Sequence, residues 1–131
     1  MPGSAELRRH AAEFEDATGL GVRLEEEPGR ILVVVERAPL PPGAFRLAVS
    51  DLLFMTDPMY PVSAMDMFWT EPEVVRPNGD VPASAESVES YLGRPWRRYS
   101  WHRNGVWNPA RNGLLDHYEF VQDRFAREVC A

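Results

Sequence analysis

The pattern of apolar and polar positions predicts a helix near each end of the chain. Residues 5–18 carry apolar side chains at helical spacing, and Gly19 and Gly21 end this segment. A second apolar stripe follows Pro109, a residue type that suits a first helical turn. The two stripes consist of Leu7, Ala11, Phe14 and Thr18, and of Leu114, Tyr118, Val121, Phe125 and Val129.

Between these helices the pattern becomes an alternating one, which predicts a four-stranded antiparallel meander. The second strand contains the β-branched run of residues 31–35, which is typical of a buried central strand. Residues 71–95 are expected to be mostly irregular, with one short helix over 85–92. The four predicted strands are residues 22–27, 31–35, 45–56 and 65–70.

This order of elements predicts an α+β fold in which the N-terminal and C-terminal helices pack on the sheet. A length of 131 residues is typical of one domain, so we expect residues 1–131 to form a single domain. An apolar fraction of 44% and a charged fraction of 26% are globular values, and they exclude wholesale disorder.

The chain contains a single cysteine, Cys130, which excludes a disulfide scaffold and a multi-cysteine zinc site. The histidines at positions 10, 102 and 117 do not stand at metal-ligand spacing. We therefore predict no metal and no cofactor. No apolar stretch approaches the roughly 20 residues of a membrane span, and charged residues follow the first few positions, unlike a secretory signal. We expect a cytoplasmic protein without membrane contact.

Basic and acidic residues are segregated along this chain, whose formal net charge is −6. Residues 90–115 contain five arginines and no acidic residue, which suggests a contact surface for something negative. Within residues 94–103, which we call the basic aromatic segment, rings are interleaved with guanidinium groups. These residues are Trp96, Arg97, Arg98, Tyr99, Trp101 and Arg103.

Three interpretations of the basic aromatic segment stay open. Tryptophan, tyrosine and arginine dominate the hot spots of protein interfaces, so a protein partner ranks first. The same residues pack in protein interiors, and this structural role ranks second. Rings and arginines also bind single-stranded nucleic acid. That role ranks third because the acidic chain repels nucleic acid at long range.

Four short motifs, in a fixed order along the chain, resemble those of one known family. They are Tyr60-Pro61, Asp66-Met67-Phe68-Trp69, Trp96-Arg97-Arg98-Tyr99-Ser100-Trp101-His102 and Trp107-Asn108-Pro109. From about residue 24 to residue 129 the chain resembles the ubiquitin-conjugating-enzyme (UBC) fold, and most closely the prokaryotic UBC-like family E. The resemblance implies a bacterial ubiquitin-like modification system. The expected partners are a ubiquitin-like modifier, an activating-enzyme-like adenylyltransferase and a deconjugating metalloprotease.

A standard conjugating enzyme carries its modifier on a cysteine that follows a His-Pro-Asn motif, whose asparagine stabilises the oxyanion. The matching residues here are Arg76-Pro77-Asn78, and residues 79–106 contain no cysteine. Cys130 lies at the end of a predicted helix, whose dipole opposes a thiolate, so we interpret it as an inert thiol. Asn78 is then either an oxyanion-stabilising residue or a turn residue before Gly79.

Ser100 and His102 form an alternative nucleophile and base, since residues two apart on an extended segment point to the same face. Asp66 or Asp116 would orient the histidine, and the serine would form an oxyester. In the competing interpretation Ser100 and His102 form a hydrogen-bonded pair that only stabilises the loop. We therefore rank a non-catalytic adaptor of the modification system first. A Ser100-dependent conjugating enzyme ranks second, and a nucleic-acid-binding module built on residues 94–103 ranks third.

Overall fold

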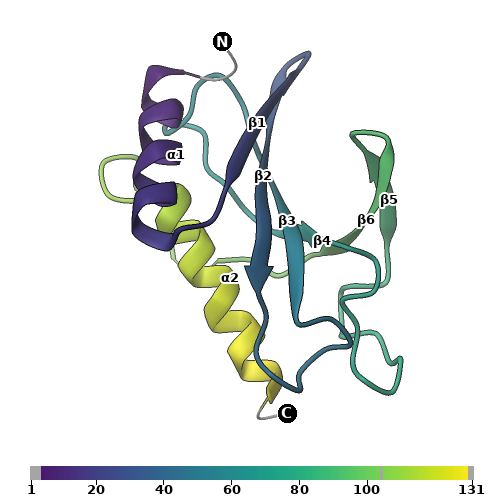
Figure 1. Cartoon of the computed structure of the whole chain (residues 1–131). Helices are drawn as coiled ribbons and strands as arrows, with labels where there is room; N and C mark the ends of the chain where they lie inside the picture. Colours follow the sequence, from purple (N-terminus) through teal and green to yellow (C-terminus); the bar gives the residue numbers. More distant parts are fainter. Residues whose placement is uncertain (1–3, 104, 130–131) are drawn as a thin grey trace.

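A computed structural model describes residues 4–103 and 105–129 of the chain. These residues form two helices and six strands (Figure 1). In chain order the elements are α1 (Ala5–Thr18), β1 (Val22–Glu27), β2 (Arg30–Pro39), β3 (Val49–Thr56), β4 (Phe68–Thr70), β5 (Val88–Tyr91), β6 (Arg94–Tyr99) and α2 (Leu114–Val129).

Helix α1 has local signals at both of its ends. The Ser4 hydroxyl caps the first turn by accepting a hydrogen bond from the N–H of Leu7 at 3.1 Å. Gly19 ends the helix in the left-handed conformation, with φ of 75°, and its N–H donates to the carbonyl of Glu15. The apolar stripe of this helix is buried against the rest of the molecule through Leu7, Ala11 and Phe14.

The sheet is antiparallel, with strand order β1-β2-β3-β4-β6-β5. Residues 31–35 of β2 are fully buried on both faces, although β2 is the second strand from one edge of the sheet. Both helices cover one face (Figure 1), where the main core joins α1 and α2 to alternate residues of the strands. Phe68, Tyr99 and Phe125 meet in this core, and the rings of Phe68 and Tyr99 are stacked with centroids 5.1 Å apart.

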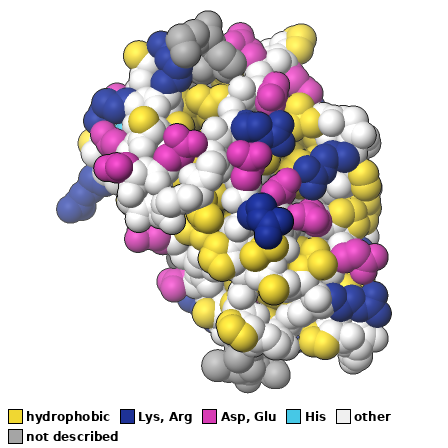
Figure 2. Space-filling view, viewed as in Figure 1, with side chains coloured by type: hydrophobic (Ala, Val, Ile, Leu, Met, Phe, Trp, Pro, Cys, Tyr) yellow, Lys and Arg dark blue, Asp and Glu magenta, His cyan; other side chains and the backbone are white. Residues whose placement is uncertain are grey.

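The opposite face of the sheet carries a second, smaller core. Trp69 and Trp96 pack there with Leu32, Val34 and Leu53. The sheet curls so that β6 brings Trp96 back toward the face formed by β2 and β3 (Figure 1). Acidic and basic side chains lie interleaved above apolar ones on the face of the molecule seen in Figure 2.

The sheet has six strands, so the expectation of a four-stranded sheet was wrong. The two additional strands lie in residues 71–99, where we expected irregular structure followed by an aromatic segment. The helix expected over 85–92 is absent, and β5 occupies residues 88–91 in its place. A two-residue turn at Leu92 and Gly93, with φ of 55° and 74°, joins β5 to β6. A leucine in this left-handed conformation is rare, which explains why the hairpin escaped prediction.

Several predicted boundaries also differ from the structure, since β2 extends to Pro39 and β4 begins only at Phe68. Strand β3 begins at Val49, because residues 40–48 form a loop. Helix α2 begins at Leu114, five residues after Pro109. The side chain of Asn108 accepts a hydrogen bond from the N–H of Ala110, and the side chain of Asn112 accepts one from the N–H of Asn108. These local bonds hold residues 108–112 in turns that compete with the helix.

Candidate functional site

A groove lies beside Asn78, the residue that the motif match predicts as oxyanion-stabilising. It has a volume of about 380 Å³ and lies between the loop after β2, the turn at residues 76–80 and the end of α2. The Asn78 amide is used inside this turn. Its oxygen accepts a hydrogen bond from the N–H of Asp80 at 2.9 Å, and its nitrogen donates to the Asp80 carboxylate at 3.0 Å.

The residues that line this groove contain no hydroxyl, thiol or imidazole in the part of the chain that the structure describes. An ion pair of 3.0 Å joins Arg76 to Glu128 of α2. The Glu128 side chain is only 15% exposed, so the contact ties the turn to the helix. The lining residues are Pro42, Gly43, Ala44, Arg76, Pro77, Asn78 and Glu128. The groove therefore offers no nucleophile among these residues. Cys130 lies outside the described residues.

Ser100 and His102 follow β6, but their side chains have separate partners. The Ser100 hydroxyl accepts a hydrogen bond from the Arg98 guanidinium at 3.0 Å. His102 Nδ1 lies 2.7 Å from the carboxylate of Asp66. No hydrogen bond joins Ser100 to His102, although both residues lie in the described part of the chain. Of the two carboxylates considered from the sequence, Asp66 is thus the one that contacts His102, while Asp116 pairs with Arg103.

The contact with His102 changes the acidity of Asp66. Partial burial raises the pKa of this carboxyl, but hydrogen bonds from His102 and from the backbone N–H groups of Arg103 and Met67 outweigh that effect. The pKa of Asp66 therefore lies below its usual range, and the group is an anion at neutral pH. A carboxylate held in this way can orient the imidazole.

The rings of the basic aromatic segment are core residues. Trp96 and Tyr99 are fully buried, and Trp101 is 8% exposed. Each ring donates one hydrogen bond to a backbone carbonyl, namely those of Tyr91, Val74 and Ala83. This is the packing arrangement that ranked second among the three interpretations. Buried rings leave no face on which a nucleic-acid base could stack.

The arginines of this segment are also tied into the fold. Arg97 donates to the carbonyls of Pro72 and Ala85, both at 2.8 Å. Arg98 forms an ion pair of 2.8 Å with Glu89, whose carboxylate also accepts a hydrogen bond from the indole of Trp69. These side-chain bonds connect β6 to β5, to Trp69 of β4 through Glu89, and to the chain segment before the hairpin.

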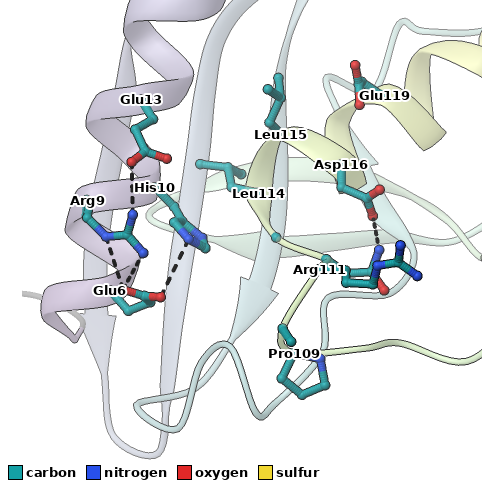
Figure 3. A pocket seen from close by; sticks show the side chains of 13 residues that line it. Glu6, Arg9, His10, Glu13, Pro109, Arg111, Leu114, Leu115, Asp116 and Glu119 are labelled. Atoms are coloured by element: carbon teal, nitrogen blue, oxygen red, sulfur yellow. Dashed lines mark hydrogen bonds and ion pairs between the residues drawn. The ribbon is translucent and has the colours of Figure 1, made fainter.

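A larger hollow, of about 410 Å³, separates α1 from the turn before α2. Figure 3 shows Arg9 of α1 between Glu6 and Glu13, with Pro109 and Arg111 on the opposite side. The mixture of both charges on its rim makes this hollow a poor match for any single class of charged ligand.

Tyr60 contacts His10, one of the residues that line this hollow, and its role was not visible in the sequence. Its hydroxyl lies 2.6 Å from His10 Nδ1 and accepts a hydrogen bond from the N–H of Leu114 at 2.8 Å. Burial raises the pKa of Tyr60 to about 12, so the phenol keeps its proton and can donate it to His10. The Tyr60-Pro61 motif had indicated a turn, whereas the phenol joins α1 to the start of α2.

The match to a family model decides what kind of protein carries these features. The model, described as prokaryotic E2 family E, matches residues 7–128. The chain belongs to this family. The resemblance inferred from the four motifs is thereby confirmed, and it relates this family E protein to ubiquitin-like conjugation in prokaryotes. Neither a curated protein nor a solved structure matches the chain.

Two further observations bear on the class of site in this family E protein. Among the described residues, no three histidine, cysteine, aspartate or glutamate side chains are grouped so that they could hold a metal ion. Neither α1 nor α2 is long and apolar enough to cross a membrane.

Proposed function

We propose that this family E protein is a non-catalytic adaptor of a bacterial ubiquitin-like modification system. In this role it binds the ubiquitin-like modifier, its activating-enzyme-like adenylyltransferase, or both, and it works in the cytoplasm without a cofactor. The observation that carries the proposal is the groove beside Asn78, whose described lining residues lack a nucleophile.

The hydrogen bonds of Asn78 support the same conclusion. An oxyanion-stabilising group must point its donor at the position where negative charge develops. The amide of Asn78 instead donates to Asp80 within its own turn. A nearby carboxylate would also disfavour a second negative charge at the same place. The turn is therefore better suited to holding the loop than to acyl transfer.

The arrangement of secondary structure supports a UBC-like fold for this adaptor. Strands β1 to β4 pair in sequence order, and both helices lie on one face of the sheet. The apolar pattern predicted a helix at each end of such a meander, and the sheet has two strands more than that prediction. An adaptor with this shape would present the surfaces of a conjugating enzyme to the modifier and activating enzyme. A deconjugating metalloprotease is the third expected component of such a system.

A conjugating enzyme that uses Ser100 is the second candidate, and the contact between His102 and Asp66 favours it. In this mechanism Ser100 Oγ attacks the activated carbonyl of the modifier and forms an oxyester. The hydroxyl proton passes to His102, and the leaving group departs from the carbonyl. The mechanism requires His102 to turn toward Ser100, since the two side chains share no hydrogen bond in the described structure.

One experiment separates these functions. The protein is mixed with the activating enzyme, the modifier and ATP from the same genome, and its intact mass is measured alongside its affinity for each component. The adaptor proposal expects binding without a covalent adduct. An adduct that alkali cleaves, that resists thiols and that disappears in Ser100→Ala would establish the second candidate.

Matched variants make the assay specific. Ser90→Ala removes an exposed hydroxyl of β5 and serves as the control for Ser100→Ala. Cys130→Ser tests the thiol outside the described residues. An adduct that thiols release and that Cys130→Ser abolishes would overturn the adaptor proposal. If the protein forms no adduct and binds neither component, both the adaptor proposal and the conjugating-enzyme alternative are wrong.

A further inference from the structure

A small, basic pocket lies beside α2, and the proposed adaptor role does not use it. Its volume is about 210 Å³, and it lies between α2 and the end of the basic aromatic segment. Three of its lining residues are arginines and only one, Asp123, is acidic, although the whole chain is acidic. The lining residues are His102, Arg103, Phe120, Asp123, Arg124 and Arg127.

Two of the guanidinium groups are held in place by the surrounding rings. Arg103 lies 5.1 Å from the ring centroid of Trp107 and 5.7 Å from that of Phe120, and its side chain is 17% exposed. Arg124 lies 4.6 Å from the ring of Trp101. Stacking on aromatic rings orders an arginine before any ligand arrives, which lowers the entropy cost of binding.

Both of these guanidinium groups contain a buried N–H without an acceptor. Arg103 uses Nη2 for its ion pair with Asp116, but its Nη1 has no partner among the described residues. The Nε of Arg124 is likewise buried and unpartnered within the described chain. A buried charged donor without an acceptor is costly, so both guanidinium groups have hydrogen-bonding capacity that the described chain leaves unused.

The acidic residues near the pocket do not supply that acceptor. Asp123 lines the pocket, yet it forms no hydrogen bond or ion pair with Arg103, Arg124 or Arg127 in the described structure. Asp66 is held by His102, which lies at the rim. Arg127 is exposed at the end of α2 and makes no ion pair with another described residue.

We propose that this pocket binds a phosphate group carried by a small molecule. Guanidinium groups bind phosphate through paired, charge-assisted hydrogen bonds. A phosphate monoester has three acceptor oxygens and a charge of about −1.5 to −2 at pH 7. That charge suits a pocket in which Arg103 already pairs with Asp116, while Arg124 and Arg127 form no ion pair with a described residue. A carboxylate has only two oxygens for the same donors. The proposal goes beyond the adaptor role and does not depend on it.

Inorganic phosphate is the first probe. Binding is measured by calorimetry and by the shift in Tm at pH 7.5, with sodium chloride added so that ionic strength stays constant. We expect phosphate to raise Tm. Arg124→Gln and Arg127→Gln are each expected to weaken phosphate binding by about tenfold or more, since each removes a charge-assisted contact.

Arg127→Gln is the more informative of the two variants, because an exposed side chain without an ion pair contributes little to folding. Its Tm without phosphate should equal that of the unaltered protein. Arg111→Gln, which removes an exposed arginine from the other hollow, is the matched control and should bind phosphate normally. If Arg127→Gln and Arg124→Gln both bind phosphate as well as this control does, the proposal is wrong.

Two further arms identify the ligand chemistry. Phosphoserine should stabilise the protein at least as well as inorganic phosphate if the pocket accepts a phosphate monoester. Acetate at the same ionic strength should produce no comparable shift. Equal stabilisation by acetate would replace the phosphate assignment with a carboxylate site. A phosphate effect no larger than that of sodium chloride would leave only general screening and would overturn the proposal.

Discussion

The groove beside Asn78 and the basic pocket are both lined by residues of α2, but their polar groups are satisfied to different extents. In the groove beside Asn78, the amide pairs with Asp80 and the guanidinium of Arg76 pairs with Glu128. Every one of these polar side chains has a partner inside the protein. Such a groove gains little by contacting a ligand, because each contact would first have to break an internal one.

The basic pocket shows the reverse pattern. The buried side-chain atoms without a partner in residues 4–103 and 105–129 are Arg103 Nη1, His117 Nδ1 and Arg124 Nε. Two of these residues belong to α2, and Arg103 stacks on Phe120 of the same helix. The comparison shows that the polar groups of the groove are satisfied inside the protein, while those of the basic pocket keep unused hydrogen-bonding capacity.

The largest expected effect concerns His117, which is fully buried in α2. Its Nε2 donates to the carbonyl of Met67 at 2.8 Å. Burial lowers the pKa of His117 from its ordinary value of 6.5 to about 4. Between these pH values the unfolded chain binds a proton here and the folded chain does not, so the free energy of unfolding falls as pH falls. The loss should reach about 3 kcal/mol at pH 4.

The variant His117→Gln tests this prediction because glutamine can donate to Met67 but does not titrate. Urea unfolding is measured from pH 7 to pH 4 for both proteins. The difference between them isolates His117 from carboxylates such as Asp66, which lose stabilising contacts at lower pH. Parallel stability curves for the two proteins would show that His117 is not held neutral.

Tyr60→Phe should have the next largest effect, because Tyr60 fixes the start of α2, the helix that lines both the groove and the basic pocket. The substitution removes the acceptor for the N–H of Leu114 and the partner of His10. Two buried hydrogen bonds of this kind are worth about 2 kcal/mol. Chemical unfolding measures the loss. Tyr118→Phe, which removes only a bond to Gln122, is the control and should cost less than half as much. Equal costs would mean that Tyr60 does not anchor α2.

Much of the fold was predictable from local patterns. Residues 5–18 and 22–27 became α1 and β1 with the predicted bounds, because the spacing of apolar residues and the flanking glycines agree there. The buried run of residues 31–35 became the centre of β2. The hairpin of β5 and β6 was not predicted, because its turn places Leu92 in a left-handed conformation that leucine rarely adopts.

The candidate site was less predictable, because it depends on contacts between distant residues. Alternation along residues 96–103 predicted two faces, and Trp96 and Tyr99 do lie in different cores. The sequence could not reveal that the rings on both faces are buried, since one set is covered by the helices and the other by the curl of the sheet. The basic pocket likewise joins Arg103 to Arg124 across the fold, which no local spacing indicates.

The smallest effects should come from the groove beside Asn78. If the Asn78 amide only holds its turn, Asn78→Ala should lower the free energy of unfolding by less than about 1 kcal/mol. It should also leave the affinity for the modifier and the activating enzyme unchanged. Asp80→Ala removes the carboxylate that accepts from the Asn78 nitrogen but keeps the backbone N–H that donates to the Asn78 oxygen. It should therefore cost no more stability than Asn78→Ala and should also leave both affinities unchanged. Loss of affinity in Asn78→Ala at unchanged stability, with Asp80→Ala unaffected, would show that the amide acts outside its turn. The groove would then resemble the basic pocket, because both would contain a polar group that is available to contact a partner.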